Sequence, residues 1–350
     1  MHPLLPEPKE IRVIQQLGRV TSEALAPLDQ LLLILPEKVP GSVWKRLPQG
    51  SKLQAAMRRR PGGSVPALQA RLANKRQTFV VGGTIARDAT AFEQLTVARK
   101  LVASVTAEKA GCLGIVVVGF DDDRQAELYR NAVSAVLAAA FALPEYKSKP
   151  SPAKIRSVRL IGLDTQVDLD RVRAEAHGNN LARWLTALPP NKLDAAGYAD
   201  MLRDLAKDRG WQYKRFGTKE LEKLGAGAFL AVALGNDNDS ASIVRMRYRP
   251  DTKAAKADLS LVGKGIIFDT GGTNLKPFQA MLDMHGDMQG SAVAVGTLLA
   301  ISELRLPVAV DAWLAITENR TGPSAYKSQD VITAANGKTI QTIHTDAEGR

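Results

Sequence analysis

Residues 261–276 read LVGKGIIFDTGGTNLK, in which an apolar strand runs into Lys264, followed by Asp269, a glycine pair and Lys276. The glycines allow a tight turn and a close approach of the backbone to a ligand. This is not a phosphate-binding loop, because Lys264 precedes the glycine pair and no Gly-Lys-Ser/Thr sequence follows it. The stretch therefore predicts a buried strand that ends in charged side chains of both signs.

Two other short segments also concentrate unusual polar residues. Residues 284–290 (MHGDMQG) lead into a predicted helix at Gly290–Leu304, and residues 344–350 (HTDAEGR) follow a predicted strand at Thr339–Ile343. Together the three segments hold four carboxylates, two lysines and one arginine, namely Asp269, Asp287, Asp346, Glu348, Lys264, Lys276 and Arg350.

Four carboxylates at strand ends would repel one another, so we expect two divalent metal ions to hold them together. Histidine and cysteine are absent from the expected ligands, and oxygen ligands suit Mn²⁺ or Mg²⁺, with Zn²⁺ bound where its availability favours it. A lysine ligand would have to lose its proton, which a neighbouring dication can enforce. The alternative for Lys264 and Asp269 is an ordinary ion pair at the end of a strand.

Apolar runs alternate with helical segments, which predicts an α/β fold. We expect an N-terminal α/β domain over residues 1–165, followed by a linker helix and a mixed-sheet α/β domain over residues 166–350. The first domain is predicted to contain strands Leu31–Leu35, Thr78–Val81, Ile115–Val118 and Val158–Leu163, with helices Ala91–Lys109 and Gln125–Ala142. The remainder is predicted to contain helices Asp168–Leu188 and Ala195–Arg209, with strands Phe229–Leu234, Ser242–Tyr248, Leu259–Val262 and Val308–Ile316.

The composition narrows the class of protein. The 350 residues are 45% hydrophobic, which is enough for two ordinary domains. A single cysteine, Cys112, excludes a disulfide within the chain and favours a reducing compartment. The N-terminus lacks the apolar run of a secretory signal, and the longest apolar stretches are too short to span a bilayer. We therefore expect a cytoplasmic protein with no membrane partner.

The positive charge is concentrated in the first domain. The net charge is +11; residues 1–165 hold 24 Lys/Arg and 14 Asp/Glu, whereas residues 166–350 hold 23 and 22. A basic domain can attract nucleic acid, and Arg58, Arg59 and Arg60 form its sharpest patch. We interpret this patch as a solvated surface loop, with nucleic-acid binding as the alternative function.

Several segments resemble the leucine (cytosol) aminopeptidase family of two-metal exopeptidases. They are GKGIIFDTGG (263–272), LKP (275–277), DM (287–288), EN (318–319) and TDAEGR (345–350). The resemblance covers about residues 168–350, whereas residues 1–165 resemble the family's variable N-terminal domain only in α/β texture and position. It implies hydrolysis of leucine-type N-terminal residues from peptides by a homo-hexamer.

The resemblance also implies how the metals are held. Asp269 would contact both ions, which the family binds as manganese or zinc. Lys264 and Asp287 would ligate one ion and Asp346 the other, while Glu348 would bridge them.

Three further residues take roles in catalysis or substrate binding through the resemblance. Lys276 would polarise the scissile carbonyl, Arg350 would hold a bicarbonate ion that acts as general base, and Met284 would line the pocket for the first residue. Physical reasoning agrees, since two cations lower the pKa of a water nucleophile and a lysine adds oxyanion stabilisation. A neutral peptide amine that ligates one metal would account for cleavage from the N-terminus.

The sequence departs from the family pattern at a few positions. His344 stands where the family usually has asparagine, and we expect it to be a packed, hydrogen-bonded support, with a metal ligand as the alternative. Gln289 and Ser291 replace smaller residues, and KSQD at 327–330 replaces a typical RPGD turn. These changes bear on substrate preference rather than on the chemistry. We interpret Glu318-Asn319 as a structural turn, with support of the metals as the alternative.

The chain ends at Arg350, whereas the family continues with a helix and further strands that complete the catalytic sheet. We therefore expect an incomplete catalytic domain. The parent protein would be an active aminopeptidase, and the 350-residue chain by itself would bind metal poorly, lack activity and aggregate.

Overall fold

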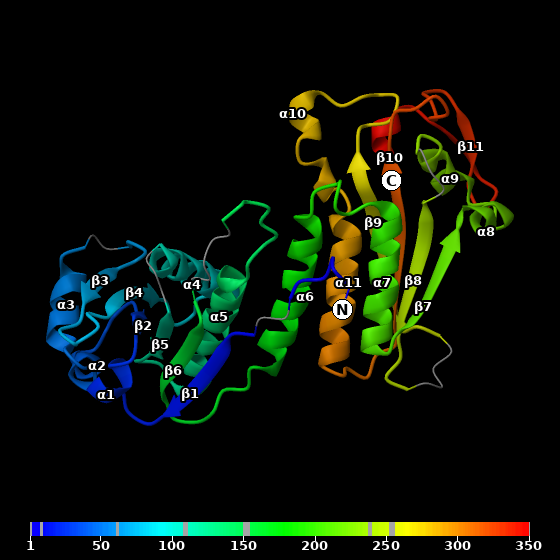
Figure 1. Ribbon diagram of the computed structural model, residues 1–350. Helices are drawn as coiled ribbons and strands as arrows, with labels where there is room; N and C mark the ends of the chain where they lie inside the picture. Colours follow the sequence, from blue (N-terminus) through cyan, green and yellow to red (C-terminus); the bar gives the residue numbers. More distant parts are fainter. Residues whose placement is uncertain are drawn as a thin grey trace. The chain divides into compact units, whose positions relative to one another are not determined.

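The computed structural model describes residues 2–7, 10–60, 63–107, 111–149, 155–236, 240–251 and 256–349. The chain divides into two compact units (Figure 1). The N-terminal unit comprises residues 8–176, and the C-terminal unit comprises residues 177–350 together with residues 1–7. The domains proposed from the sequence, 1–165 and 166–350, stay a prediction.

The described part of the N-terminal unit forms a six-stranded sheet in the order β1-β6-β5-β2-β4-β3. All neighbouring strands are parallel except β3, which pairs antiparallel with β4. The strands are β1 (Arg12–Leu17), β2 (Gln30–Pro36), β3 (Leu68–Arg71), β4 (Phe79–Ile85), β5 (Cys112–Val117) and β6 (Ser157–Leu163). The helices are α1 (Ser22–Leu25), α2 (Gly41–Arg46), α3 (Gly50–Arg58), α4 (Ala91–Thr106) and α5 (Asp122–Ala140).

Strand β2 explains why this sheet is covered on both faces. Every residue of its run QLLLILP is buried. Because successive side chains point to opposite faces, Leu32 and Ile34 enter one hydrophobic cluster, whereas Leu31, Leu33 and Leu35 enter another. Two apolar faces require two covering layers, which is the α/β arrangement predicted from the sequence.

The described part of the C-terminal unit contains a mixed four-stranded sheet in the order β7-β8-β10-β9. Strand β8 is antiparallel to both neighbours, and β10 is parallel to β9. The strands are β7 (Gln212–Gly217), β8 (Ser242–Tyr248), β9 (Leu259–Asp269) and β10 (Val310–Asn319), with a separate antiparallel pair β11 (Val331–Thr333) and β12 (Thr339–Gln341). The helices are α7 (Ala195–Arg209), α8 (Thr218–Lys223), α9 (Gly227–Ala233), α10 (Phe278–Met281) and α11 (Gln289–Glu303), together with the part of α6 (Asp170–Thr186) from His177 onward.

Glycines bring α11 close to its neighbours. A Cβ atom on Gly263 of β9 would lie 2.5 Å from the Cα of Ser291, so the first turn of α11 rests directly on the strand. A Cβ atom on Gly178 of α6 would lie 2.3 Å from the carbonyl oxygen of Gly296 of α11. Larger residues at these positions would push α11 away from the middle of β9, where Lys264 lies.

One predicted strand is wrong. Residues Phe229–Leu234 were expected to form a strand, but residues Gly227–Ala233 form helix α9. A short apolar run has too little periodicity to separate a buried strand from a partly buried helix. Strand β7 was not predicted, because its sequence QYKRFG is mostly polar, which an edge strand tolerates.

Among the described residues, no helix combines the length and apolar character that crossing a membrane requires.

Candidate functional site

The site begins where the parallel strands β9 and β10 end side by side. Their register places Asn319 opposite Asp269, after an irregularity near Thr317. Both side chains are buried, with exposed fractions of 0% for Asn319 and 2% for Asp269. Because carboxyl ends of parallel strands meet at one edge of a sheet, polar residues 50 positions apart in sequence become neighbours.

After Asp269 the chain turns sharply at the glycine pair singled out in the sequence. Gly271 and Gly272 have φ values of +91° and +68°, in the left-handed region that favours glycine. A Cβ atom on Gly271 would also lie 2.4 Å from the carbonyl oxygen of Asn274. The turn keeps Asp269 at the strand end and returns the chain so that Lys276 faces it.

The segment from Thr345 to Glu348, which we call the TDAE turn, is anchored onto this glycine turn. The Thr345 hydroxyl donates to the Gly271 carbonyl at 2.6 Å and accepts from the Asn274 N–H at 2.9 Å. The Thr345 N–H donates to Asn274 Oδ1 at 2.8 Å, and the Tyr326 hydroxyl donates to the Thr345 carbonyl at 2.8 Å. These bonds hold the TDAE turn against the end of β9.

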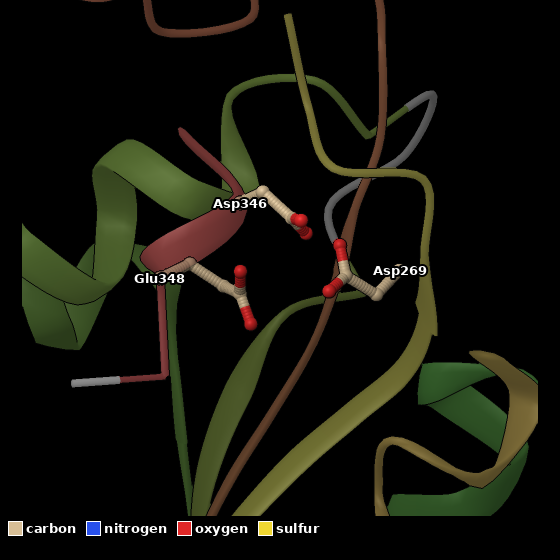
Figure 2. Close-up of side chains that lie close together, drawn as sticks. All are labelled: Asp269, Asp346 and Glu348. Atoms are coloured by element: carbon tan, nitrogen blue, oxygen red, sulfur yellow. The ribbon is translucent and has the colours of Figure 1, made fainter. Parts of the chain in front are cut away.

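Three carboxyl groups converge as a result. Figure 2 shows the side chains of Asp269, Asp346 and Glu348 turned toward one another. Each offers an oxygen that lies within 4.8 Å of the others, an arrangement that could hold a metal ion. Asp269 is buried, and the other two are half-buried.

Two lysines complete the cluster. Lys264 Nζ lies 2.7 Å from Asp287 Oδ2 and 2.6 Å from Glu348 Oε1. Lys276 Nζ lies 3.2 Å from Asp269 Oδ2 and also pairs with Asp346 Oδ1.

The cluster as a whole is rich in negative charge. Four carboxylates share two ammonium groups, which leaves an excess of two negative charges when all six groups are ionised. Their chemistry fits divalent cations, because the hard oxygen donors of three carboxylates already face a common space.

The ion pairs shift the protonation of the lysines. Burial disfavours the charge on Lys264, but the carboxylates of Asp287 and Glu348 outweigh this and raise the pKa of Lys264 above its usual value. Burial also disfavours the charge on Lys276, but the carboxylates of Asp346 and Asp269 outweigh this and raise the pKa of Lys276. Burial raises the pKa of Asp287, helped by the nearby charges of Asp269 and Glu348 and opposed by Lys264.

The structure thus brings together six of the seven charged residues singled out in the sequence. Arg350, the seventh, lies outside the described residues. Met284 is half-buried in the short 3₁₀ turn Met284–Gly286, which packs against β9, and its place in a substrate pocket stays a prediction.

Two residues that depart from the family pattern, His344 and Ser291, form hydrogen bonds with nearby residues. His344 is exposed, so the expected packing is wrong, but its Nδ1 accepts a hydrogen bond of 3.2 Å from the Asp346 N–H, as a cap of the turn. Ser291 is buried in α11, where its hydroxyl donates to the Met288 carbonyl at 2.7 Å and lies 3.0 Å from the Tyr198 hydroxyl. Gln289 is exposed.

Asn319 is the site residue that sequence reasoning assigned mainly to structure. Its amide nitrogen donates to Asp269 Oδ1, to the Thr345 carbonyl and to Glu348 Oε2. The signal that could have found it is its place at the end of an apolar strand, immediately after Glu318.

The arginine patch of the N-terminal unit is not uniform. Arg58 and Arg59 are exposed, whereas Arg60 donates to the Pro66 carbonyl at 2.9 Å and to the Gln69 side chain. The surrounding sequence is strongly basic, since residues 38–87 contain eleven Lys/Arg and no Asp/Glu. Nucleic-acid binding by this patch stays the alternative to a solvated surface, and Arg60 is already engaged within the fold.

The different environments of the three arginines lead to different expected effects on binding of duplex DNA. If the patch contacts phosphates, replacing Arg58 and Arg59 with alanine should reduce the log–log salt slope of binding by about two, one per contact. The additional change Arg60→Ala should alter the slope little, because its guanidinium is bonded to Pro66 and Gln69. Fluorescence anisotropy across a salt series measures the slope, and no binding at low salt would leave the patch as solvated surface.

The second half of the chain is similar to a known protein family. Residues 180–350 match the cytosol aminopeptidase family, catalytic domain. A probable cytosol aminopeptidase of Solibacter usitatus is 38% identical over 223 residues, covering 63% of this chain and 46% of the relative. One of Synechococcus sp. is 36% identical over 280 residues, covering 78% of this chain and 56% of the relative. The chain therefore spans about half the length of the curated relatives it matches.

Solved structures show the same architecture. A mutant of tomato leucine aminopeptidase superposes with a TM-score of 0.82 over 99% of this chain and 70% of that chain, at 20% identity, which establishes the fold alone. The bottromycin maturation enzyme BotP in complex with Mn gives a TM-score of 0.74 at 25% identity, covering 92% of this chain and 66% of that chain. The α/β fold class predicted from the sequence is confirmed.

Proposed function

We propose that the whole protein removes leucine-type N-terminal residues from peptides by metal-dependent hydrolysis, because residues 180–350 match the catalytic domain of the cytosol aminopeptidase family. The observation that carries the proposal is the convergence of three carboxylates with two lysines at the ends of β9 and β10. The family resemblance adds a cytoplasmic homo-hexamer and peptide substrates to the proposal.

Five side chains would hold two divalent metal ions, manganese or zinc: Lys264, Asp269, Asp287, Asp346 and Glu348. The four carboxylates support this, because their four negative charges equal the four positive charges of two dications. When bound, the ions would activate a water molecule and stabilise the negative charge that develops during peptide hydrolysis.

Lys276 would act on the substrate as a proton-bearing cation. Its pKa is raised, so the side chain stays an ammonium at neutral pH. It faces Asp269 and Asp346, beside the proposed metal positions, where it could donate to the scissile carbonyl oxygen. A fixed positive charge at this point stabilises an oxyanion more than it stabilises the neutral carbonyl. Arg350 would hold bicarbonate as general base, and Met284 would line the first-residue pocket.

The protonation of Lys264 provides a test of the metal site. Its raised pKa means that the metal-free protein carries an ammonium there at neutral pH, whereas a nitrogen ligand must be neutral. Binding of Mn²⁺ should therefore release a proton, and the affinity should fall by about tenfold per pH unit as the pH is lowered.

Calorimetric titration of Mn²⁺ in buffers of different ionisation enthalpy counts the released protons. Lys264→Met should remove one proton from the count at pH 7, and the exposed Lys338→Met should leave it unchanged. Equal proton release by Lys264→Met and the wild type would contradict the assignment of Lys264 as a ligand.

A further inference from the structure

The side chain of Asn319 joins two of the proposed metal ligands. Its Nδ2 atom donates to Asp269 Oδ1 at 2.8 Å and to Glu348 Oε2 at 3.2 Å. It also donates to the Thr345 carbonyl at 3.0 Å, on the segment that carries Glu348. The side chain is fully buried, so water does not compete for these acceptors. One neutral amide thus ties the end of β9 to the TDAE turn.

These bonds divide the oxygens of each carboxylate between two kinds of partner. Asp269 Oδ1 accepts from Asn319 and from the Gly271 N–H at 2.8 Å, whereas Asp269 Oδ2 faces the Lys276 ammonium. Glu348 Oε2 faces Asn319, whereas its Oε1 lies 2.6 Å from a lysine ammonium. In both residues one oxygen is held by neutral N–H groups and the other is turned toward a cation.

The position of the Asn319 amide is itself fixed. The Asn319 carbonyl accepts from both the N–H and the hydroxyl of Thr270, each at 2.9 Å, which pins the end of β10 to β9. Gly272 leaves room for the amide, because a Cβ atom there would lie 2.9 Å from Asn319 Oδ1. The amide therefore has little freedom to follow the carboxylates if they move.

We propose that Asn319 is a positioning residue that determines which oxygens of Asp269 and Glu348 face the metal ions. The inference rests on the proposed function. Neutral N–H donors suit this role, because an acidic side chain would repel both carboxylates and an apolar one would remove a donor from each of them. With the amide removed, both carboxylates can rotate and lose the arrangement that a cation requires.

The test compares Mn²⁺ binding by two asparagine variants of the purified full-length protein. Asn319→Ala should raise the Kd for Mn²⁺ by about 10- to 100-fold, the range for loss of a group that orients metal ligands. Asn236→Ala is the matched control, because Asn236 Nδ2 donates at 2.9 Å to the Thr317 hydroxyl of the same strand β10 and has no bond to a carboxylate among the described residues. This control should leave the Kd unchanged.

A second variant and a second measurement separate positioning from stability. Asn319→Ser keeps a small donor and should show a smaller loss of affinity. If Asn319→Ala does not fold, the Kd of Asn319→Ser is compared with that of the wild type instead. Circular dichroism gives the Tm of each metal-free variant. A lower Tm with a wild-type Kd would assign Asn319 a structural role only and overturn the inference. If the wild type takes up no Mn²⁺, the proposed function fails first and the inference with it.

Discussion

Asp269→Ala should abolish the uptake of both metal ions and reduce peptide hydrolysis by several orders of magnitude. Asp269 is buried at the end of β9, and its Oδ2 atom is the oxygen that faces the neighbouring cation, Lys276. The amide of Asn319 donates to both Asp269 and Glu348. Loss of the Asp269 carboxylate therefore affects the ends of both β9 and β10. Elemental analysis and hydrolysis of leucine amide by the full-length protein measure the two effects.

A near-isosteric variant separates charge from shape. In Asp269→Asn the Oδ1 atom can still accept from Gly271 and Asn319, so the turn should survive. The new Nδ2 would replace the oxygen that faces a cation, and metal uptake should still be lost. Asp283→Ala, in the exposed loop between Lys276 and Asp287, is the control and should retain metal and activity. Full metal occupancy in Asp269→Asn would show that Asp269 is not a ligand.

Lys276→Ala should lower kcat by about 10²- to 10³-fold, the range for loss of one oxyanion-stabilising donor. The side chain is mostly buried beside Asp269 and Asp346, and its raised pKa keeps it charged at neutral pH. Because its charge would act mainly on the transition state, the KM for a leucyl substrate should change little.

Metal analysis must accompany this variant, since Lys276 also pairs with two proposed ligands. Lys276→Ala should retain both ions, because removing an ammonium group lessens competition for the carboxylates. Lys338→Ala, at an exposed position, should keep the wild-type kcat. A rise in KM with unchanged kcat would make Lys276 a binding residue and contradict its role in the transition state.

Local patterns were sufficient for most of the fold. Strand β8 and helix α7 have the bounds predicted from the sequence, because their alternating and helical periodicities are strong. Helix α5 begins at Asp122, earlier than expected, because Asp121 caps it by accepting the Arg124 N–H. The prediction of a strand at Phe229–Leu234 was wrong because an apolar run of this length fits a helix as well as a strand.

The charged residues of the site were also visible in the sequence, because carboxylates and lysines are unusual beside buried strands. The contribution of Asn319 was not, since it depends on the register between β9 and β10. That pairing joins positions 50 residues apart, and only its geometry places one amide between Asp269 and Glu348. The engagement of Arg60 was hidden in the same way, because its partners, Pro66 and Gln69, are brought near it only by the fold.

Exhaustive chelation of the full-length protein, followed by stepwise return of Mn²⁺, tests the central claim most directly. The cluster of Asp269, Asp346, Glu348 and two lysines predicts that hydrolysis of leucine amide is lost on chelation. Activity should return as the metal content rises to about two ions per chain, as expected for a two-metal hydrolase. Hydrolysis that survives complete removal of metal would contradict the two-metal account.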